Sequence, residues 1–495
     1  MKRKRSKWSY AVGCTGRDMC YTLVSMFLLM YIQFSGLMNE EQYAVMFLVI
    51  GACRVWDAVN DPMMGTIISN TKTRLGKYRP WLIGGALSNA IFLILMFTLR
   101  FENGWANVIA LSILYLLWET TFTMNDVSYW SLLPALADDK EDRDKLTSMV
   151  AIFASVGAFT AAGLVPMFTT NDTINGYRNF GIIFAIVFIL CQILVFFFTH
   201  DNKYDKFMLT KEELAQEPQE KEATLKDMFK ILFRNKQLLV MGLVVLLYST
   251  ASGFLVSFGQ NLFYFKFGYY GDKVFIFTII YAVGTLASQA LCPLLTKKFK
   301  RSQLVKASLF TTMIGYLLFF IVCNLPINQD ICFILLCLFG MLIFCGQGVF
   351  YLVMLIMLTN TIEYDEWQTG ERNEAVTFSV RPFMVKLSSA IQTILVSGSL
   401  LVFGLISITN KIGELEEDKN YGIITEAELN EGANELLATA ENWQLFGLSA
   451  AMTLIPIAMF IASYILIKKK YIIDEDMYEL MLKEIEERKN NTVEK

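Results

Sequence analysis

The sequence predicts an all-α membrane protein with twelve transmembrane helices in two halves of six. Hydrophobic residues make up 55% of the 495 residues and aromatic residues 14%, which is too apolar for a soluble multidomain protein. Twelve apolar stretches are long enough to cross a bilayer, and most charges lie in the short polar segments between them. A long charged segment follows the sixth stretch and divides the chain into its two halves.

The loops between the predicted spans indicate the orientation of the chain. Lysine and arginine are concentrated before the first span and after the second, fourth, sixth, eighth and twelfth spans, which places both termini in the cytoplasm. The predicted spans are 19–38, 41–68, 81–99, 106–136, 147–168, 179–199, 238–265, 274–295, 304–324, 331–362, 376–407 and 444–467.

An acidic external loop at 408–443 interrupts the second half. It contains a possible amphipathic helix at 426–437 and is interpreted as a solvated insertion in preference to a cap over the outer mouth. The tail after the last span is interpreted as a charged cytoplasmic helix. The expected parts are an N-terminal bundle at 1–200, a cytoplasmic linker at 201–237, a C-terminal bundle at 238–470 and a tail at 471–495.

The basic turns that follow the second and the eighth span are similar. NTKTRLGKYRP and TKKFKRSQ occupy the same place in each half. Two six-helix halves with related cytoplasmic turns are typical of the major facilitator architecture, in which the substrate site lies at mid-membrane between the halves. Because any positive-inside loop has this composition, the repeat only supports the prediction.

The composition also excludes several classes of site. The single histidine, His200, rules out a histidine-rich metal site. The nine cysteines lie in or next to apolar runs without zinc-type spacing, so they are interpreted as packing residues. The net charge of −3 and the lack of a basic patch interleaved with aromatics give no indication of nucleic-acid binding. No covalent chemistry, and no cofactor besides a coupling ion, is expected.

Two carboxylates lie four residues apart inside the second predicted span. On a helix Asp57 and Asp61 point the same way, with Asn60 and Arg54 near the same stripe. Ionisable acids at mid-membrane are costly, so they should face a water-filled cavity or bind a cation. Together with Thr123 they supply the oxygen ligands that a hard monovalent cation requires. Alternatively, the pair carries a proton, because close like charges raise one pKa, or forms a salt-bridge lattice.

The fourth predicted span carries another polar face. Thr123, Asp126 and Trp130 occur at i, i+3 and i+7 and share one side of a helix. A carboxylate beside an indole suits a sugar, because it accepts hydrogen bonds from adjacent hydroxyls while the ring covers the sugar's C–H patch. Alternatively, Asp126 only balances a cation such as Lys386 or Arg54. Further charges inside the membrane are Asp18 in the first span and Arg381 and Lys386 in the eleventh.

The segment EYDEWQTGERNE after the tenth span is predicted to be a charged cytoplasmic loop. In one interpretation it forms ion pairs with the basic turn of the other half and locks an inner gate, and in the other it is merely solvated. The residues of this charge network are Arg54, Arg74, Lys77 and Arg79 in the first half and Glu366 and Arg372, with their acidic neighbours, in the second.

Five motifs resemble those of the glycoside–pentoside–hexuronide:cation symporters, a family of the major facilitator superfamily. The resemblance spans the transmembrane core and leaves out the external loop and the tail. The motif DxxxD joined to the basic turn RxGKxRP is its most specific part. The motifs are GRD at 16–18, RVWDAVNDPMMG at 54–65, TRLGKYRPW at 73–81, TFTMNDVSYWSLLP at 121–134 and EYDEWQTGERNEAVTFSVRPFMVK at 363–386.

The resemblance implies a role for each matching residue. The carboxylates of Asp18 and Asp126 match those that bind sugar hydroxyls, and Trp130 matches the stacking indole. Lys386 matches a lysine near both sites, and Tyr351 lies where another sugar-facing aromatic is expected. The positions that match the ligands of the coupling cation, which is Na+, Li+ or H+, are Asp57, Asn60, Asp61 and Thr123.

Three positions depart from the family pattern. Ala151 stands where many members place a sugar-binding arginine, and Arg17 replaces a lysine before Asp18. Arg381 adds a cation at a position expected to be polar and neutral. The chain thus lacks a basic group at Ala151 and gains one at Arg381. This change suits binding of a different glycoside or of an acidic sugar, so Arg17 and Arg381 are assigned to the substrate site.

The expected function is cation-coupled inward transport of a sugar or glycoside by alternating access, in a monomeric multi-pass protein of the cell membrane. Three alternatives stay open. A hexuronide is one, and an amphipathic lipid-like solute, which requires a wide, apolar, laterally open cavity, is another. The third is a membrane receptor that uses a transporter fold without transport.

Overall fold

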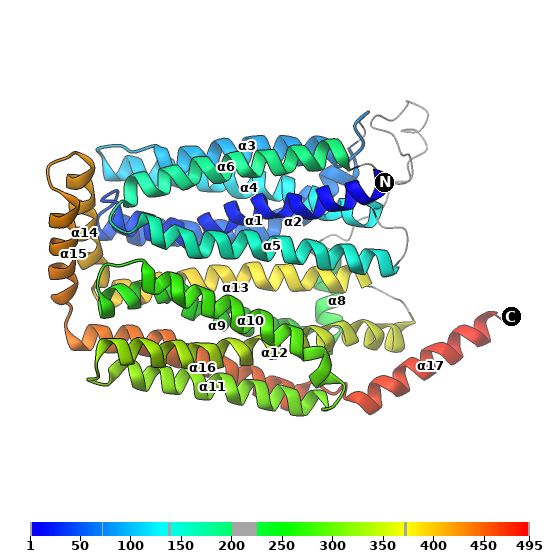
Figure 1. Ribbon diagram of the computed structural model, residues 1–495. Helices are drawn as coiled ribbons and strands as arrows, with labels where there is room; N and C mark the ends of the chain where they lie inside the picture. Colours follow the sequence, from blue (N-terminus) through cyan, green and yellow to red (C-terminus); the bar gives the residue numbers. More distant parts are fainter. Residues whose placement is uncertain (1, 72, 137–139, 200–224, 371–373, 494–495) are drawn as a thin grey trace. The chain divides into compact units, whose positions relative to one another are not determined.

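The computed structural model describes residues 2–71, 73–136, 140–199, 225–370 and 374–493, and these form sixteen α-helices and no strand (Figure 1). Most of the predicted linker at 201–237, together with His200 and Arg372, lies outside the described residues. Eleven of the described helices are long and apolar enough to cross a membrane. The all-helical prediction is confirmed.

Each predicted span falls on one long helix except 376–407, whose last residues lie in a separate helix. Of the helices that match predicted spans, α1 is not among the eleven apolar ones; it is long enough to span but carries Arg17 and Asp18 at its centre. The helices of the predicted spans are α1 (Lys2–Phe34), α2 (Glu40–Ser69), α3 (Arg79–Thr98), α4 (Gly104–Leu136), α5 (Lys140–Thr169), α6 (Thr173–Phe198), α9 (Lys236–Phe267), α10 (Asp272–Thr296), α11 (Arg301–Asn324), α12 (Gln329–Thr369), α13 (Glu374–Val402) and α16 (Asn442–Lys470).

Local sequence signals set several helix boundaries. Asn39 caps α2 and exchanges hydrogen bonds with Gln42 in a capping box, which satisfies two backbone donors that a helix start leaves unpaired. Gly370 ends α12 with a left-handed backbone, φ +75°, which a glycine adopts without a Cβ clash. The acidic residues Asp365 and Glu366 therefore lie on the last turns of a helix, and the prediction of a loop there is wrong.

The chain folds as two compact units. The first consists of Met1–Glu222, Phe263–Ile276 and Leu400–Ala440, and the second of Ala223–Leu262, Phe277–Ser399 and Glu441–Lys495. In the first unit α1 packs against α5 and α6, α3 against α4 and α6, and α2 against α4. In the second unit α11 packs against α12 and α16. The short α8 (Leu225–Arg234) also belongs to the second unit.

Small residues let α1 approach its neighbours closely. A Cβ on Gly16 would lie 2.8 Å from the backbone of Phe188 in α6, and one on Gly157 in α5 would lie 2.3 Å from the carbonyl oxygen of Thr15. Close backbone approach at small residues is the usual way in which membrane helices associate. It fixes the segment of α1 that carries Arg17.

The external loop is not a solvated insertion. It forms α14 (Leu405–Asn420) and α15 (Glu426–Ala438), and α14 packs against α1, α2 and α6. Gly413 lies so close to Gly36 that an added Cβ would come within 2.5 Å of its backbone nitrogen. The helix predicted at 426–437 is confirmed as α15, whereas the predicted span 376–407 is broken at Gly404, whose φ is +68°.

The C-terminal tail forms the predicted charged helix, α17 (Glu475–Val493), which packs against α12. The indole of Trp367 donates a hydrogen bond to Glu484 at 2.6 Å, and Arg488 donates one back to the Trp367 carbonyl oxygen at 2.7 Å. The tail is therefore attached to the second unit by specific contacts.

Candidate functional site

A buried guanidinium holds two carboxylates together in the first unit. Arg17 on α1 is only 3% exposed, and its side chain lies 3.1 Å from Asp18 and 2.9 Å from Asp126 on α4. The thiol of Cys14 also donates to Asp18, at 2.9 Å, and accepts from Arg17 at 3.1 Å. Burial of a charge is tolerated where opposite charges compensate it, which Asp18 and Asp126 do here.

Aromatic rings surround this cluster of charges. The guanidinium carbon of Arg17 lies 4.6 Å from the ring centre of Tyr129 and 5.2 Å from that of Trp130. Tyr129 is fully buried and stacks on Tyr10 with ring centres 4.3 Å apart, whereas Trp130 is 40% exposed. Asp18 and Asp126 keep about a quarter of their side-chain surface exposed. The cluster therefore brings partly exposed carboxylate oxygens and an indole face together around a buried cation.

A second cluster lies one helical turn away on α4. The hydroxyl of Thr123, which is 1% exposed, donates to Asp57 on α2 at 2.9 Å. Asp57 and Asn60 are each 6% exposed, and Asp61 is half-buried on the same stretch of α2. In the described part of the chain no three acidic, cysteine or histidine side chains gather as a metal site.

Arg54 and Glu119 complete this second cluster. Arg54, 8% exposed, donates to the carbonyl oxygen of Ser25 on α1 at 3.1 Å. Glu119, 3% exposed, accepts from Tyr115 at 2.5 Å. The sequence prediction missed Glu119, although it is an acid inside an apolar run, the same signal that identified Asp57. Glu119 and Asp57 both interact electrostatically with the guanidinium of Arg54, so one cation is shared by two carboxylates.

A network of amides fixes the helices that carry both clusters. Asn125 on α4 donates to the Leu82 carbonyl oxygen at 2.8 Å and to Gln192 on α6 at 3.1 Å. Gln192 in turn donates to the Gly13 carbonyl oxygen on α1 at 2.9 Å. These groups are buried and partnered, so they hold α1, α3, α4 and α6 in one arrangement next to Asp126.

The second unit contains the remaining predicted substrate residues. Arg381 on α13 donates a hydrogen bond to the hydroxyl of Tyr351 on α12, and its guanidinium lies 5.7 Å from the centre of the Tyr351 ring. Tyr351 also stacks on Tyr248, with ring centres 6.0 Å apart. Lys386 is half-buried and lies five residues further along α13.

The predicted gate residues make contacts within their own units. Arg79 is 5% exposed and donates to the carbonyl oxygen of Thr199 at the end of α6. Lys77 lies 5.1 Å from the centre of the Tyr78 ring, and Arg74 is exposed. Glu366 is 6% exposed, and its neighbour Asp365 pairs with Arg234 on α8 at 3.0 Å.

Helix α14 buries an acid within the first unit. Glu416 is 1% exposed and accepts hydrogen bonds from the backbone and the hydroxyl of Thr173, each at 3.0 Å, and from Tyr269 at 2.9 Å. Burial raises the pKa of Glu416 to about 7, although these donors and Lys419 oppose the shift. The charged groups around it are Asp172, which pairs with Lys419 at 2.7 Å, and Glu417, which pairs with Arg100 at 3.4 Å.

This raised pKa predicts that α14 is held more firmly at acidic pH. An acid whose pKa rises from 4.5 to about 7 on folding stabilises the folded state below about 4.5, and this stabilisation is lost as the pH rises through about 7. The difference is about 3 kcal/mol. The melting temperature of the purified protein should therefore fall between about pH 5 and about pH 8. Glu416→Gln should flatten the profile, whereas Glu417→Gln should not, and an unchanged slope in Glu416→Gln would contradict the assignment.

Comparison with known proteins identifies the class of this chain. A family model described as "MFS/sugar transport protein" matches residues 9–475. Lactose permease from Lactobacillus delbrueckii subsp. bulgaricus is 28% identical over 98% of this chain and 73% of its own length. Raffinose carrier protein from Pediococcus pentosaceus is 27% identical, covering 80% of this chain and 62% of its own length. This chain thus spans about three fifths to three quarters of these relatives.

A third relative and two solved structures are also transport proteins. The glucuronide carrier protein homolog of Escherichia coli K12 is 27% identical over 77% of this chain and 80% of its own length. Among solved structures, a bacterial homolog of the lysosomal transporter Spinster has a TM-score of 0.63 at 12% identity, covering 95% of this chain and 98% of its own. The D-xylose–proton symporter has a TM-score of 0.59 at 12% identity, covering 94% and 97%. These two solved structures confirm the major facilitator fold. Because the family model matches residues 9–475, the chain belongs to the MFS/sugar transport protein family, whose members are membrane transporters and not enzymes.

Proposed function

We propose that this protein carries a sugar or glycoside across the cell membrane together with a monovalent cation. One observation supports coupling in particular. Asp126, which faces Arg17, and Thr123, which binds Asp57, lie one turn apart on α4. A cation that binds Asp57 changes the position of the same helix turn that presents Asp126, so the two ligands can raise each other's affinity.

In this proposal the charge cluster on α1 and α4 binds the sugar. Adjacent sugar hydroxyls donate to the carboxylates of Asp18 and Asp126 and accept from the guanidinium of Arg17. The exposed face of Trp130 packs on the apolar side of the sugar ring. Alternating access then exposes the occupied site to each side of the membrane in turn.

The second cluster binds the coupling ion, which is Na+, Li+ or H+. Asp57, Asp61, Asn60 and Thr123 are the proposed ligands, and Arg54 partly offsets the carboxylates when no ion is bound. One positive charge that moves down a potential of about 100 mV supplies about 2.3 kcal/mol, which is about a fiftyfold concentration ratio of a neutral sugar. We propose a monomer as the transporting unit.

Uptake into proteoliposomes tests this function. Purified protein is reconstituted, and uptake of radiolabelled lactose, raffinose and a glucuronide is measured with an inward Na+ gradient, an inward H+ gradient and no gradient. At least one of these sugars should accumulate above its external concentration with one gradient only. Binding of sugars without gradient-driven flux would instead favour a receptor, and flux that no cation gradient alters would exclude symport.

A further inference from the structure

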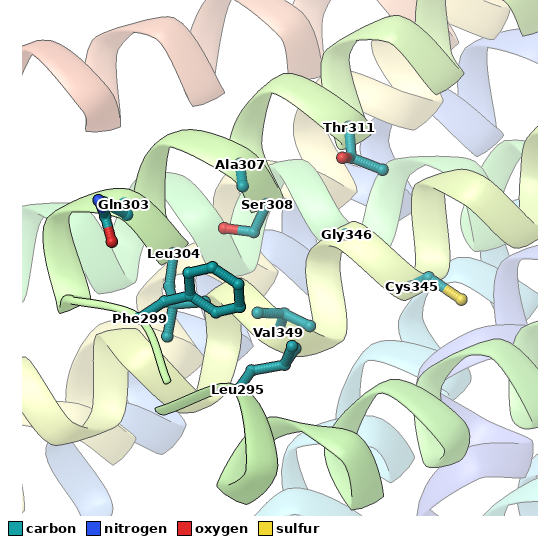
Figure 2. A pocket seen from close by; sticks show the side chains of 10 residues that line it. All are labelled: Leu295, Phe299, Gln303, Leu304, Ala307, Ser308, Thr311, Cys345, Gly346 and Val349. Atoms are coloured by element: carbon teal, nitrogen blue, oxygen red, sulfur yellow. The ribbon is translucent and has the colours of Figure 1, made fainter. Parts of the chain in front are cut away.

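An apolar groove lies on the second unit, whereas both charge clusters belong to the first. It has a volume of about 510 Å³ and is formed by the end of α10, the first half of α11 and the middle of α12 (Figure 2). This volume is within the range of about 300–1,000 Å³ that is typical of small-molecule sites. Nothing in the proposed transport cycle uses this groove.

The lining of the groove suits a hydrocarbon chain. Figure 2 shows Leu295, Leu304 and Val349 clustered around Phe299, with Ala307 on the α11 side. At Gly346 the backbones of α11 and α12 approach so closely that a Cβ would lie 2.8 Å from the Ser308 carbonyl oxygen. Glycine at this position therefore lets α12 pack directly against α11 along this wall of the groove.

One end of the groove is rich in positive charge. Lys297, Lys298 and Lys300 flank Phe299 in the turn between α10 and α11, and all three are exposed. Lys306 is exposed one residue before Ala307 on the groove wall. Arg301, in contrast, is already engaged by Glu475 at 3.9 Å. Several lysine side chains are therefore available to bind a phosphate group at one end of the apolar groove.

This combination identifies the occupant by its chemistry. A basic pocket beside membrane-spanning helices attracts anionic lipid headgroups, while an apolar surface groove accepts an acyl chain. We propose that the groove binds one anionic phospholipid of the adjacent leaflet, with its phosphate at Lys298 and Lys300 and an acyl chain along Leu304 and Val349. This lipid stays bound at the protein surface and is not the transported solute.

Retention of phosphatidylglycerol by the full-length protein tests the site. The protein is reconstituted in phosphatidylcholine with or without phosphatidylglycerol, extracted, and examined by native mass spectrometry. We expect one tightly retained phosphatidylglycerol. The double variant Lys298→Gln/Lys300→Gln should bind it about thirtyfold more weakly, because each lysine near the surface contributes about fivefold. The matched double variant Lys468→Gln/Lys469→Gln, at the end of α16, should bind it normally.

Two further measurements distinguish the groove from a merely charged surface. Ala307→Trp fills the groove and keeps every lysine, so it should abolish retention, and its melting temperature without the anionic lipid shows whether it folds. Cys345 lines the groove, whereas Cys337 on the same helix does not, so phosphatidylglycerol should slow maleimide labelling of Cys345 relative to Cys337. Retention by folded Ala307→Trp, or equal labelling of both thiols, would show headgroup adsorption only and overturn the proposal.

Discussion

Replacing Asp57 with cysteine is expected to abolish cation-driven accumulation of the sugar, so that uptake stops at equal concentrations inside and outside. Asp57 is 6% exposed and accepts the hydroxyl hydrogen of Thr123, so its carboxylate is held at the junction of α2 and α4. The thiol carries no negative charge to bind the ion and is a poor ligand for a hard cation. At about 100 mV the accumulation ratio should therefore fall from about fiftyfold to one.

The same loss is expected for Asp61→Cys but not for two matched controls. Thr123→Ser keeps the hydroxyl that contacts Asp57 and should retain most of the coupling. Asp172→Asn removes a carboxylate that pairs with Lys419 outside the membrane spans and should leave accumulation unchanged. Accumulation is measured in proteoliposomes with an imposed potential, and the amount of inserted protein is determined for each variant. Full accumulation by Asp57→Cys would remove Asp57 from the coupling site.

Patterns that depend on one helix could be predicted from the sequence. The spacing of Thr123, Asp126 and Trp130 placed them on one face of α4, and a helix carries all three. Hydrophobic length predicted the long helices because a bilayer requires about twenty apolar residues for each crossing. The extent of α12 past the apolar run was missed, because its end is set by Gly370 and by packing of α17 and not by hydrophobicity.

Features that depend on several helices could not be predicted in the same way. The sequence suggested Lys386 or Arg54 as the cation beside Asp126, whereas the structure places Arg17 there at 2.9 Å. This pairing joins α1 to α4, and Gly16 and Gly157 let α1 approach α6 and α5, so it depends on tertiary packing. In the same way, the charge of α14 suggested exposure to solvent, while Glu416 became buried through its partners on other segments.

Replacing Arg17 with glutamine is expected to reduce sugar affinity at least a hundredfold. One guanidinium reaches Asp18 with one nitrogen and Asp126 with the other, so it holds the two carboxylates next to each other. Its removal leaves two neighbouring carboxylates without this cation, and breaking a buried ion pair costs about 3–5 kcal/mol of stability. Loss of binding alone would therefore not separate a binding role from a structural one.

Two companion variants make that separation. Arg17→Lys keeps the positive charge, but its single nitrogen cannot contact both carboxylates as the two guanidinium nitrogens do. The protein should therefore fold but bind the sugar roughly tenfold more weakly, a loss of about 1.4 kcal/mol. Arg17→Gln/Asp126→Asn removes one charge of each sign, so stability should return while the sugar stays unbound, since a carboxylate acceptor and the guanidinium donor are both gone. Affinity is measured by quenching of tryptophan fluorescence, to which Trp130 contributes, and stability by thermal unfolding. If the double variant recovered binding together with stability, Arg17 would be a packing residue whose only function is to hold α1 against α4.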